Sequence, residues 1–280
     1  MKKIFLLAII FGLTSIVFAQ VDLPRPSPKA SIMQRIGVTD VTITYSRPGV
    51  KSRVIWGELV PYEKVWRTGA NEATTISFST DVKIEGQNLP AGTYALFTIP
   101  GKREWTFIFN KTSDQWGAFD YKQDQDALRV KVKPEEGPDE EWMNFIFRNL
   151  TVNSADVVLR WAKLKVQFGI QTDTVGKVMA DCRAGMKNLK ADDSRTPRGC
   201  AQFAADNNGD MTEALQWIDK SIAVKEAFNN LAVKARLQAK AGKKAEAIQT
   251  ANKALTLTKD VPAEDIDALK KQIAEWGGKP

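Results

Sequence analysis

The chain has 280 residues and a net charge of +7, with 43% hydrophobic and 26% charged residues. This composition excludes a disordered or collagen-like chain, and the length suffices for two domains. The sequence contains no histidine, which excludes Ser-His-Asp and Cys-His nucleophiles, HExxH zinc sites and imidazole acid-base catalysis. The charge is too mild to indicate a nucleic-acid partner.

Residues 1–19 have the pattern of an export signal. Two lysines precede an apolar run that starts at Ile4, and Ala19 is a small residue at the expected cleavage site. The run is too short for a membrane span, and no later segment approaches 18 apolar residues. We expect a mature chain that begins at Gln20, has no membrane span and no cysteine for a lipid anchor, and is periplasmic or secreted.

Residues 20–172 are predicted to form a β-rich domain. Short alternating runs are separated by Gly, Pro, Asn and Asp, and residues 128–133 (LRVKVK) alternate apolar and basic side chains. Trp105 alternates with Phe107 and Phe109, so we place it inside the domain. No helical patterns of 10 to 15 residues intervene, which favours an antiparallel β-sandwich over a parallel βαβ sheet.

Residues 173–280 are predicted to form an all-α domain, which makes the chain a multidomain α+β protein. Alanine becomes frequent there and tyrosine disappears. Gly209 and Ala214 align with Gly242 and Ala247 at an offset of 33 residues, which resembles a degenerate tetratricopeptide repeat. Such repeats bind a peptide or protein in a concave groove, or the helices simply pack on the β-domain. The expected helices lie near 173–189, 196–207, 211–225, 229–241, 244–258 and 263–276.

Cys182 and Cys200 are the only cysteines in the chain. In an exported protein, two cysteines on neighbouring helices are a candidate disulfide, and the alternative is two buried, unpaired thiols. Two cysteines without histidine are a poor metal site.

The segment at residues 46–74 is the candidate ligand-binding loop. It does not alternate like a strand, and a long irregular segment rich in arginine, aromatic and amide groups is typical of a binding loop on a rigid scaffold. The alternative is a structured connection whose charged groups satisfy one another and the backbone. The candidate ligand-binding residues are Arg47, Arg53, Trp56, Tyr62, Trp66, Arg67, Thr68, Asn71 and Glu72.

Several long motifs resemble one bacterial family over about residues 22–170. They are SRPGVKSRVIWGELVPYEKVWRTGANEAT, LPAGTYALFTIPG, WTFIFNK and WGAFDY, and together they resemble the family called domain of unknown function 2911. The resemblance implies an exported chain with helical repeats behind the β-domain. It implies no reaction, and it adds emphasis to the RTGANEAT segment, including Gly69.

Acidic residues offer further candidates. The oxygens of Asp120, Asp124 and Asp126 suit Ca²⁺ in principle, but they do not match an EF-hand loop, and solvation of a loop is the favoured interpretation. The run PEEGPDEE at 134–141 is predicted to be a solvated turn. Exposed aromatic residues such as Trp116 can stack on sugar rings or peptide side chains.

These observations favour an exported, non-enzymatic binding or scaffold protein of the bacterial envelope. Its expected partners are an envelope protein or peptide at the helical repeats and a glycan or small ligand at the β-domain. We assign no catalytic residue, metal or cofactor. One alternative is an envelope hydrolase acting on glycans, in which Glu72 and Asp120 act as the paired carboxylates. Another is a purely structural envelope protein with no small ligand.

Overall fold

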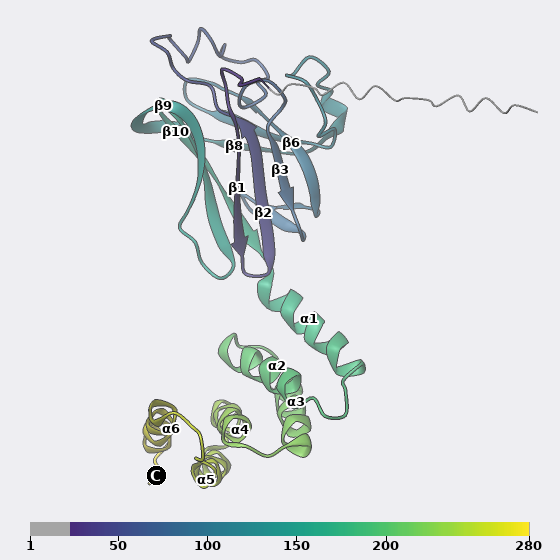
Figure 1. Ribbon diagram of the computed structural model, residues 1–280, viewed down its shortest axis with the longest axis vertical. Coiled ribbons are helices and arrows are strands. Elements are labelled where there is room, and N and C mark those ends of the chain that lie inside the picture. Colours follow the sequence, from purple (N-terminus) through teal and green to yellow (C-terminus); the bar gives the residue numbers. More distant parts are fainter. Residues whose placement is uncertain (1–22, 280) are drawn as a thin grey trace, which may run out of the picture.

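The computed structural model describes residues 23–279, and the expected export signal at 1–19 lies outside these residues. All strands lie between residues 29 and 172, and six helices follow between 174 and 275. Figure 1 shows the strands gathered at one end of the molecule and the helices at the other, with α1 (Thr174–Lys187) leading from the sheets to the remaining helices. The predicted order of a β-rich part followed by a helical part is confirmed.

The strands form two antiparallel sheets. The larger has six strands in the order β1-β2-β3-β6-β7-β8, and the smaller has four in the order β5-β4-β10-β9. The larger sheet contains β1 (Lys29–Ile36), β2 (Thr39–Ser46), β3 (Thr75–Phe78), β6 (Gly92–Ile99), β7 (Trp105–Asn110) and β8 (Asp126–Val132). The smaller contains β4 (Val82–Ile84), β5 (Gln87–Leu89), β9 (Glu135–Arg148) and β10 (Ser154–Thr172).

The prediction of a solvated turn at 134–141 is wrong, because β9 begins at Glu135. Strand β9 pairs with β10 through irregular registers. Basic side chains on β10 balance the acidic run: Lys165 Nζ lies 2.9 Å from Glu135 Oε2, and Arg160 Nη1 lies 3.7 Å from Glu140 Oε1. Cross-strand charge pairs of this kind offset the low strand propensity of glutamate, glycine and proline.

Residues from both sheets contribute to one hydrophobic core. The rings of Phe107 on β7 and Phe168 on β10 meet edge to face, with centroids 4.8 Å apart. Trp105 is fully buried, as its alternation with Phe107 predicts. Together these side chains couple the sheets into a support for the loops that cross them.

The six expected helices are confirmed, with small shifts at their ends. They are α1 (Thr174–Lys187), α2 (Arg195–Asp206), α3 (Met211–Val224), α4 (Phe228–Lys240), α5 (Lys244–Leu255) and α6 (Ala263–Glu275). The first turn of α3 is capped by Asp210, whose carboxylate accepts hydrogen bonds from the backbone N–H groups of Thr212 and Glu213. No helix within residues 23–279 is both long enough and apolar enough to span a membrane.

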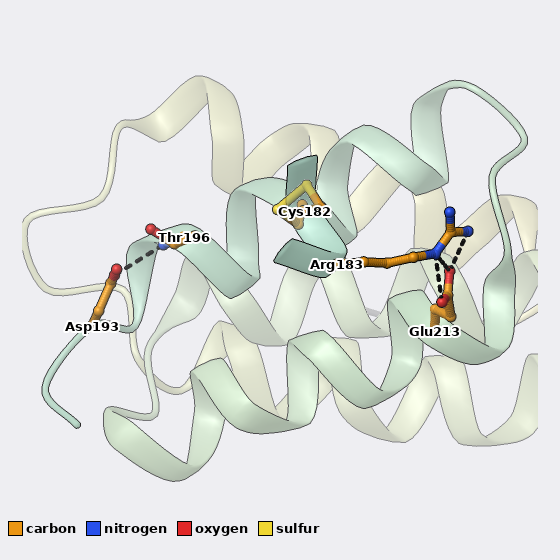
Figure 2. Close-up of a disulfide and its surroundings, with 6 residues drawn as sticks. Cys182, Arg183, Asp193, Thr196 and Glu213 are labelled. Atoms are coloured by element: carbon orange, nitrogen blue, oxygen red, sulfur yellow. Dashed lines mark hydrogen bonds and ion pairs between the residues drawn. A yellow bond between two sulfur atoms is a disulfide. The ribbon is translucent and has the colours of Figure 1, made fainter. Parts of the chain in front are cut away.

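A disulfide joins Cys182 on α1 to Cys200 on α2, the candidate pair (Figure 2). Beside it, Arg183 reaches from α1 to Glu213 on α3 and donates three hydrogen bonds of 2.8 to 3.0 Å to its carboxylate. At the other end of α1, Thr174 Oγ1 donates to the carbonyl of Val152, 2.9 Å away. The first helix is therefore fixed to the β9–β10 connection at one end and to its neighbouring helices at the other.

Candidate functional site

The predicted ligand segment runs from the end of β2 to the start of β3 and is held by isolated backbone bridges. Gly49 pairs with Trp142, Trp66 with Thr98, and Glu72 with Trp116. These contacts come from three different parts of the β-region. The segment is therefore a structured connection along most of its length, and its candidate residues divide into two groups.

The first two arginines hold the connection together. Arg47 Nε donates to the carbonyl of Met143 at 2.9 Å, across 96 residues of chain. Arg53 donates to the carbonyls of Gly49 at 2.7 Å and Val50 at 3.1 Å. Because these donors serve backbone carbonyls, they stabilise the loop rather than face a ligand.

The tryptophans of the segment join the core. Trp56 packs edge to face on Trp105, with centroids 5.0 Å apart, and Trp66 stacks on Trp161 at 5.9 Å. The indole N–H of Trp66 donates to the carbonyl of Gly69 at 3.1 Å. Four tryptophans distant in sequence thus anchor the connection to both sheets.

Tyr62 and Thr68 have structural contacts as well. The ring of Tyr62 lies against Gly57, and Lys102 Nζ is 5.9 Å from its centroid. Thr68 is buried, and its hydroxyl donates to Thr98 Oγ1 at 3.1 Å. These contacts leave Arg67, Asn71 and Glu72, which are partly exposed, as the remaining candidates.

The end of the connection pairs with a second loop, residues 111–125. The N–H of Ala73 donates to the carbonyl of Gln115 at 2.9 Å, and the N–H of Gly117 donates to that of Asn71 at 3.1 Å. Ala73 also packs with Phe97 and Ile108 in a small second core. Since Phe97 and Ile108 alternate with residues of the main core, the two loops cover the opposite face of the larger sheet.

A buried polar network fixes the second loop. The Asp126 carboxylate accepts hydrogen bonds from Tyr121 and Arg129 at 2.7 Å and from Asn110 at 2.8 Å. Asn110 Nδ2 also donates to the Lys122 carbonyl at 2.9 Å. Every oxygen of Asp126 therefore has a partner inside the protein, which holds the loop rigid.

The Ca²⁺ hypothesis finds no support in this geometry. Asp126 serves the network, whereas Asp120 and Asp124 are exposed. Within residues 23–279, no group of three or more acidic, cysteine or histidine side chains is arranged to hold a metal ion.

Glu72 forms an ion pair that the sequence did not reveal. Arg25 Nη1 lies 2.6 Å from Glu72 Oε1, and the Arg25 guanidinium is 6.0 Å from the ring centroid of Trp116. The hydrogen bond from Arg25 is the main reason that the pKa of Glu72 lies below its usual range, and Lys29 lowers it further. Asn71 Nδ2 donates to the Ser27 carbonyl at 3.2 Å. Residues 25–27 therefore lie against the end of the connection.

Arg67 has a different environment. It is half-buried, and burial lowers the pKa of its guanidinium. Its Nε is enclosed without a hydrogen-bond partner, and no ion pair of its side chain exists among the residues that the structure describes. Phe119, which is 81% exposed, lies near it, because both side chains border the space beside Gly117. Trp116, one residue before Gly117, is 56% exposed, and its ring contacts Arg25.

Arg67, Glu72, Trp116 and Phe119, with Arg25, are called the arginine–aromatic surface below. Phe119 and Arg25 were missed from the sequence because they lie outside the 46–74 segment. The WGAFDY motif was the available signal for Trp116 and Phe119, since an aromatic-rich turn between strands is unusual unless its rings are used or covered.

A second hollow lies among the helices. It is formed by α2, α4 and α6, has a volume of about 400 Å³, and is lined by Arg198, Gln202, Phe228, Arg236, Asp265 and Gln272 among others. Arg236 Nη2 donates to Gln202 Oε1 across the hollow. Two arginines against one aspartate give this lining a basic character.

The structure defines the protein as one with a β-rich part followed by a helical part, each with a polar candidate surface. The comparison with protein families identifies it further. The family model described as "Protein of unknown function (DUF2911)" matches residues 27–170, just over half of the chain. The chain belongs to this family, as its motifs indicate. Neither a curated protein nor a solved structure matches it.

Proposed function

We propose that the chain is an exported, non-enzymatic binding or scaffold protein of the bacterial envelope. The β-part binds a ligand or partner at the arginine–aromatic surface, and the helical part contacts proteins. The observation that carries this proposal is the half-buried Arg67, which has no counterion among residues 23–279, with the exposed Phe119 beside it and the exposed Trp116 in the same turn. Guanidinium and aromatic groups are enriched where proteins bind partners.

The proposal includes a β-sandwich and degenerate tetratricopeptide-like repeats. The shared core of the two sheets supports the sandwich. Buried Ala214 and Ala247, at equivalent repeat positions, support the repeats because small residues let helices approach closely. Gly242 takes a left-handed conformation between α4 and α5, with φ of +81°, whereas Asn208 takes it at the equivalent turn, beside Gly209.

The basic hollow of α2, α4 and α6 suits an acidic peptide segment of an envelope protein. Arg198 and Arg236 supply the positive charge, and Gln202 and Gln272 supply amide groups for a peptide backbone. This part of the proposal is independent of the arginine–aromatic surface and has its own test.

The hydrolase alternative is weaker. A glycosidase needs a general acid whose pKa is raised, whereas Arg25 lowers the pKa of Glu72. The same ion pair leaves Glu72 poorly placed as a proton donor near neutral pH. No observation singles out Asp120 as its catalytic partner.

The test is affinity capture from an envelope extract with residues 20–280 as bait. Three further baits are compared: Arg67→Ala/Glu72→Ala, Arg198→Ala/Arg236→Ala, and the control Asp139→Ala/Arg148→Ala, which removes exposed charges of both signs from β9. Circular dichroism confirms that each bait is folded. We expect a glycan or protein retained by the wild type and the control but lost by one of the first two variants. Equal retention by all four baits, or capture of nothing, would contradict the proposal.

A further inference from the structure

Arg67 is an unusual residue energetically. A guanidinium remains charged at all ordinary pH values, and its partial removal from water costs free energy that a nearby carboxylate normally offsets. No such carboxylate pairs with it among residues 23–279, and its Nε lacks any acceptor. The two terminal nitrogens are not enclosed, so an anion from solution can reach them.

One exposed aromatic side chain lies beside this charge, and a second belongs to the same turn. A Cβ atom built on Gly117 would lie 3.6 Å from Arg67 Nη1 and 2.9 Å from the Phe119 ring, so both groups border the same small space. Trp116 precedes Gly117 and is exposed. Exposed rings next to a cation provide a surface that covers the apolar or ring-shaped part of a ligand while the cation holds its charge.

The platform that carries these groups is already ordered. Backbone hydrogen bonds join residues 71–73 to residues 115–117, and the Asp126 network fixes the rest of the loop. A ligand that binds there does not have to order the loop, so little conformational entropy is lost on binding. This favours binding of a small molecule.

The charge balance selects the type of anion. Arg25 is already paired with Glu72, so Arg67 offers one uncompensated positive charge. The exposed charges that flank the aromatic turn in sequence balance one another, since they are Asp114, Asp120, Lys111 and Lys122, so Arg67 itself sets the charge of the anion. A single carboxylate matches one guanidinium in charge and in the geometry of its two oxygens.

We propose that the arginine–aromatic surface binds a carboxylate attached to a ring, with the terminal nitrogens of Arg67 pairing with the carboxylate and Trp116 and Phe119 covering the ring. This inference rests on the proposed function of the same surface and specifies its ligand. A uronic acid unit of a glycan and a peptide that ends in an aromatic residue both carry this chemistry.

The test is titration calorimetry of residues 20–280 with four probes: trigalacturonic acid, its methyl ester, N-acetylphenylalanine and its amide. Trp fluorescence supplies a second readout, in which the Trp116→Phe variant identifies the signal of Trp116. We expect one of the two acids to bind and its uncharged counterpart to bind at least tenfold more weakly. Binding of trigalacturonic acid assigns the ligand to glycans, and binding of N-acetylphenylalanine assigns it to peptide ends.

Two variants and one control locate the binding. Arg67→Gln removes the guanidinium, Trp116→Ala removes an exposed ring, and Arg148→Gln removes an exposed arginine charge at the end of β9, away from this surface. We expect at least a tenfold loss for Arg67→Gln, a smaller loss for Trp116→Ala and none for Arg148→Gln. Trp116→Ala keeps the test valid should Arg67→Gln not fold.

Three results would overturn the inference: no binding of either acid, equal binding of an acid and its uncharged counterpart, or tighter binding of glucose 6-phosphate than of both acids. The capture experiment separates this failure from failure of the proposed function. Capture that depends on Arg67 and Glu72, without binding of either acid, refutes the carboxylate and leaves the surface as a binding site. Capture that is independent of both refutes the binding site itself.

Discussion

The disulfide between α1 and α2 gives a prediction with a calculable size. The Cys182→Ala/Cys200→Ala variant removes a covalent link that spans 18 residues. In the chain-entropy description, a link that closes a loop of this length stabilises the folded state by about 3 kcal/mol, because it restricts the unfolded chain. Both cysteines are buried, so the smaller alanine side chains also lose packing, and the two effects have the same sign.

The assay is urea unfolding followed by circular dichroism at the helical minimum, together with tryptophan fluorescence. For a helical region of this size, we expect the helical midpoint to fall by about 1–3 M urea. Reduced wild-type protein is the matched control, because it breaks the link without changing the side chains. It should lose most of the same stability, and the midpoint of the β-part should move little, because both cysteines lie in the helical part.

A helical midpoint that is the same for oxidised, reduced and variant protein would refute this reasoning. It would mean that the packing of α1 on α2, together with the Arg183–Glu213 pair, already fixes the two helices. The disulfide would then add no stability.

Three further predictions concern the β-part. Asp126→Asn should lower the free energy of unfolding by about 2 kcal/mol, since it weakens the hydrogen-bond network of a nearly buried carboxylate; an unchanged urea midpoint would contradict this. Gly37→Ala should destabilise by at least about 1 kcal/mol in thermal unfolding, because Gly37 has φ of +58° and a Cβ there would overlap Thr174; full stability would show that the junction relaxes. The pKa of Glu72 is lowered from 4.5 by Arg25, so its small stabilising contribution is present at neutral pH and lost as the pH falls through the lowered value. The urea midpoints of wild type and Glu72→Gln should therefore differ at pH 7 and converge near pH 2, and a constant difference would disprove the ion pair's role.

Local periodicity predicted the strands and helices well. Helix signals depend on residues close in sequence, such as Asp210 before the first turn of α3, and the structure has this cap. The prediction of a turn at residues 134–141 was wrong because the strand there depends on residues that are distant in sequence. Its acidic residues are stabilised by Lys165 and Arg160 on β10, whose positions across the sheet cannot be read from the run itself.

The candidate site was predictable only in part, because its partners are remote in sequence. Arginine and tryptophan in an irregular segment are equally consistent with binding and with structural support. The carbonyl of Met143 decides the role of Arg47, and Trp161 helps to decide that of Trp66. Only tertiary structure shows that Arg67 has no ion-pair partner within residues 23–279.

The central claim is that the chain binds its ligand at the arginine–aromatic surface. Amide hydrogen exchange of residues 20–280, with and without the material retained in the capture experiment, tests this claim most directly. We predict slower exchange at residues 67–73 and 115–121 in the presence of that material. Slower exchange confined to other strands or to the helices would contradict the claim and place the binding site elsewhere.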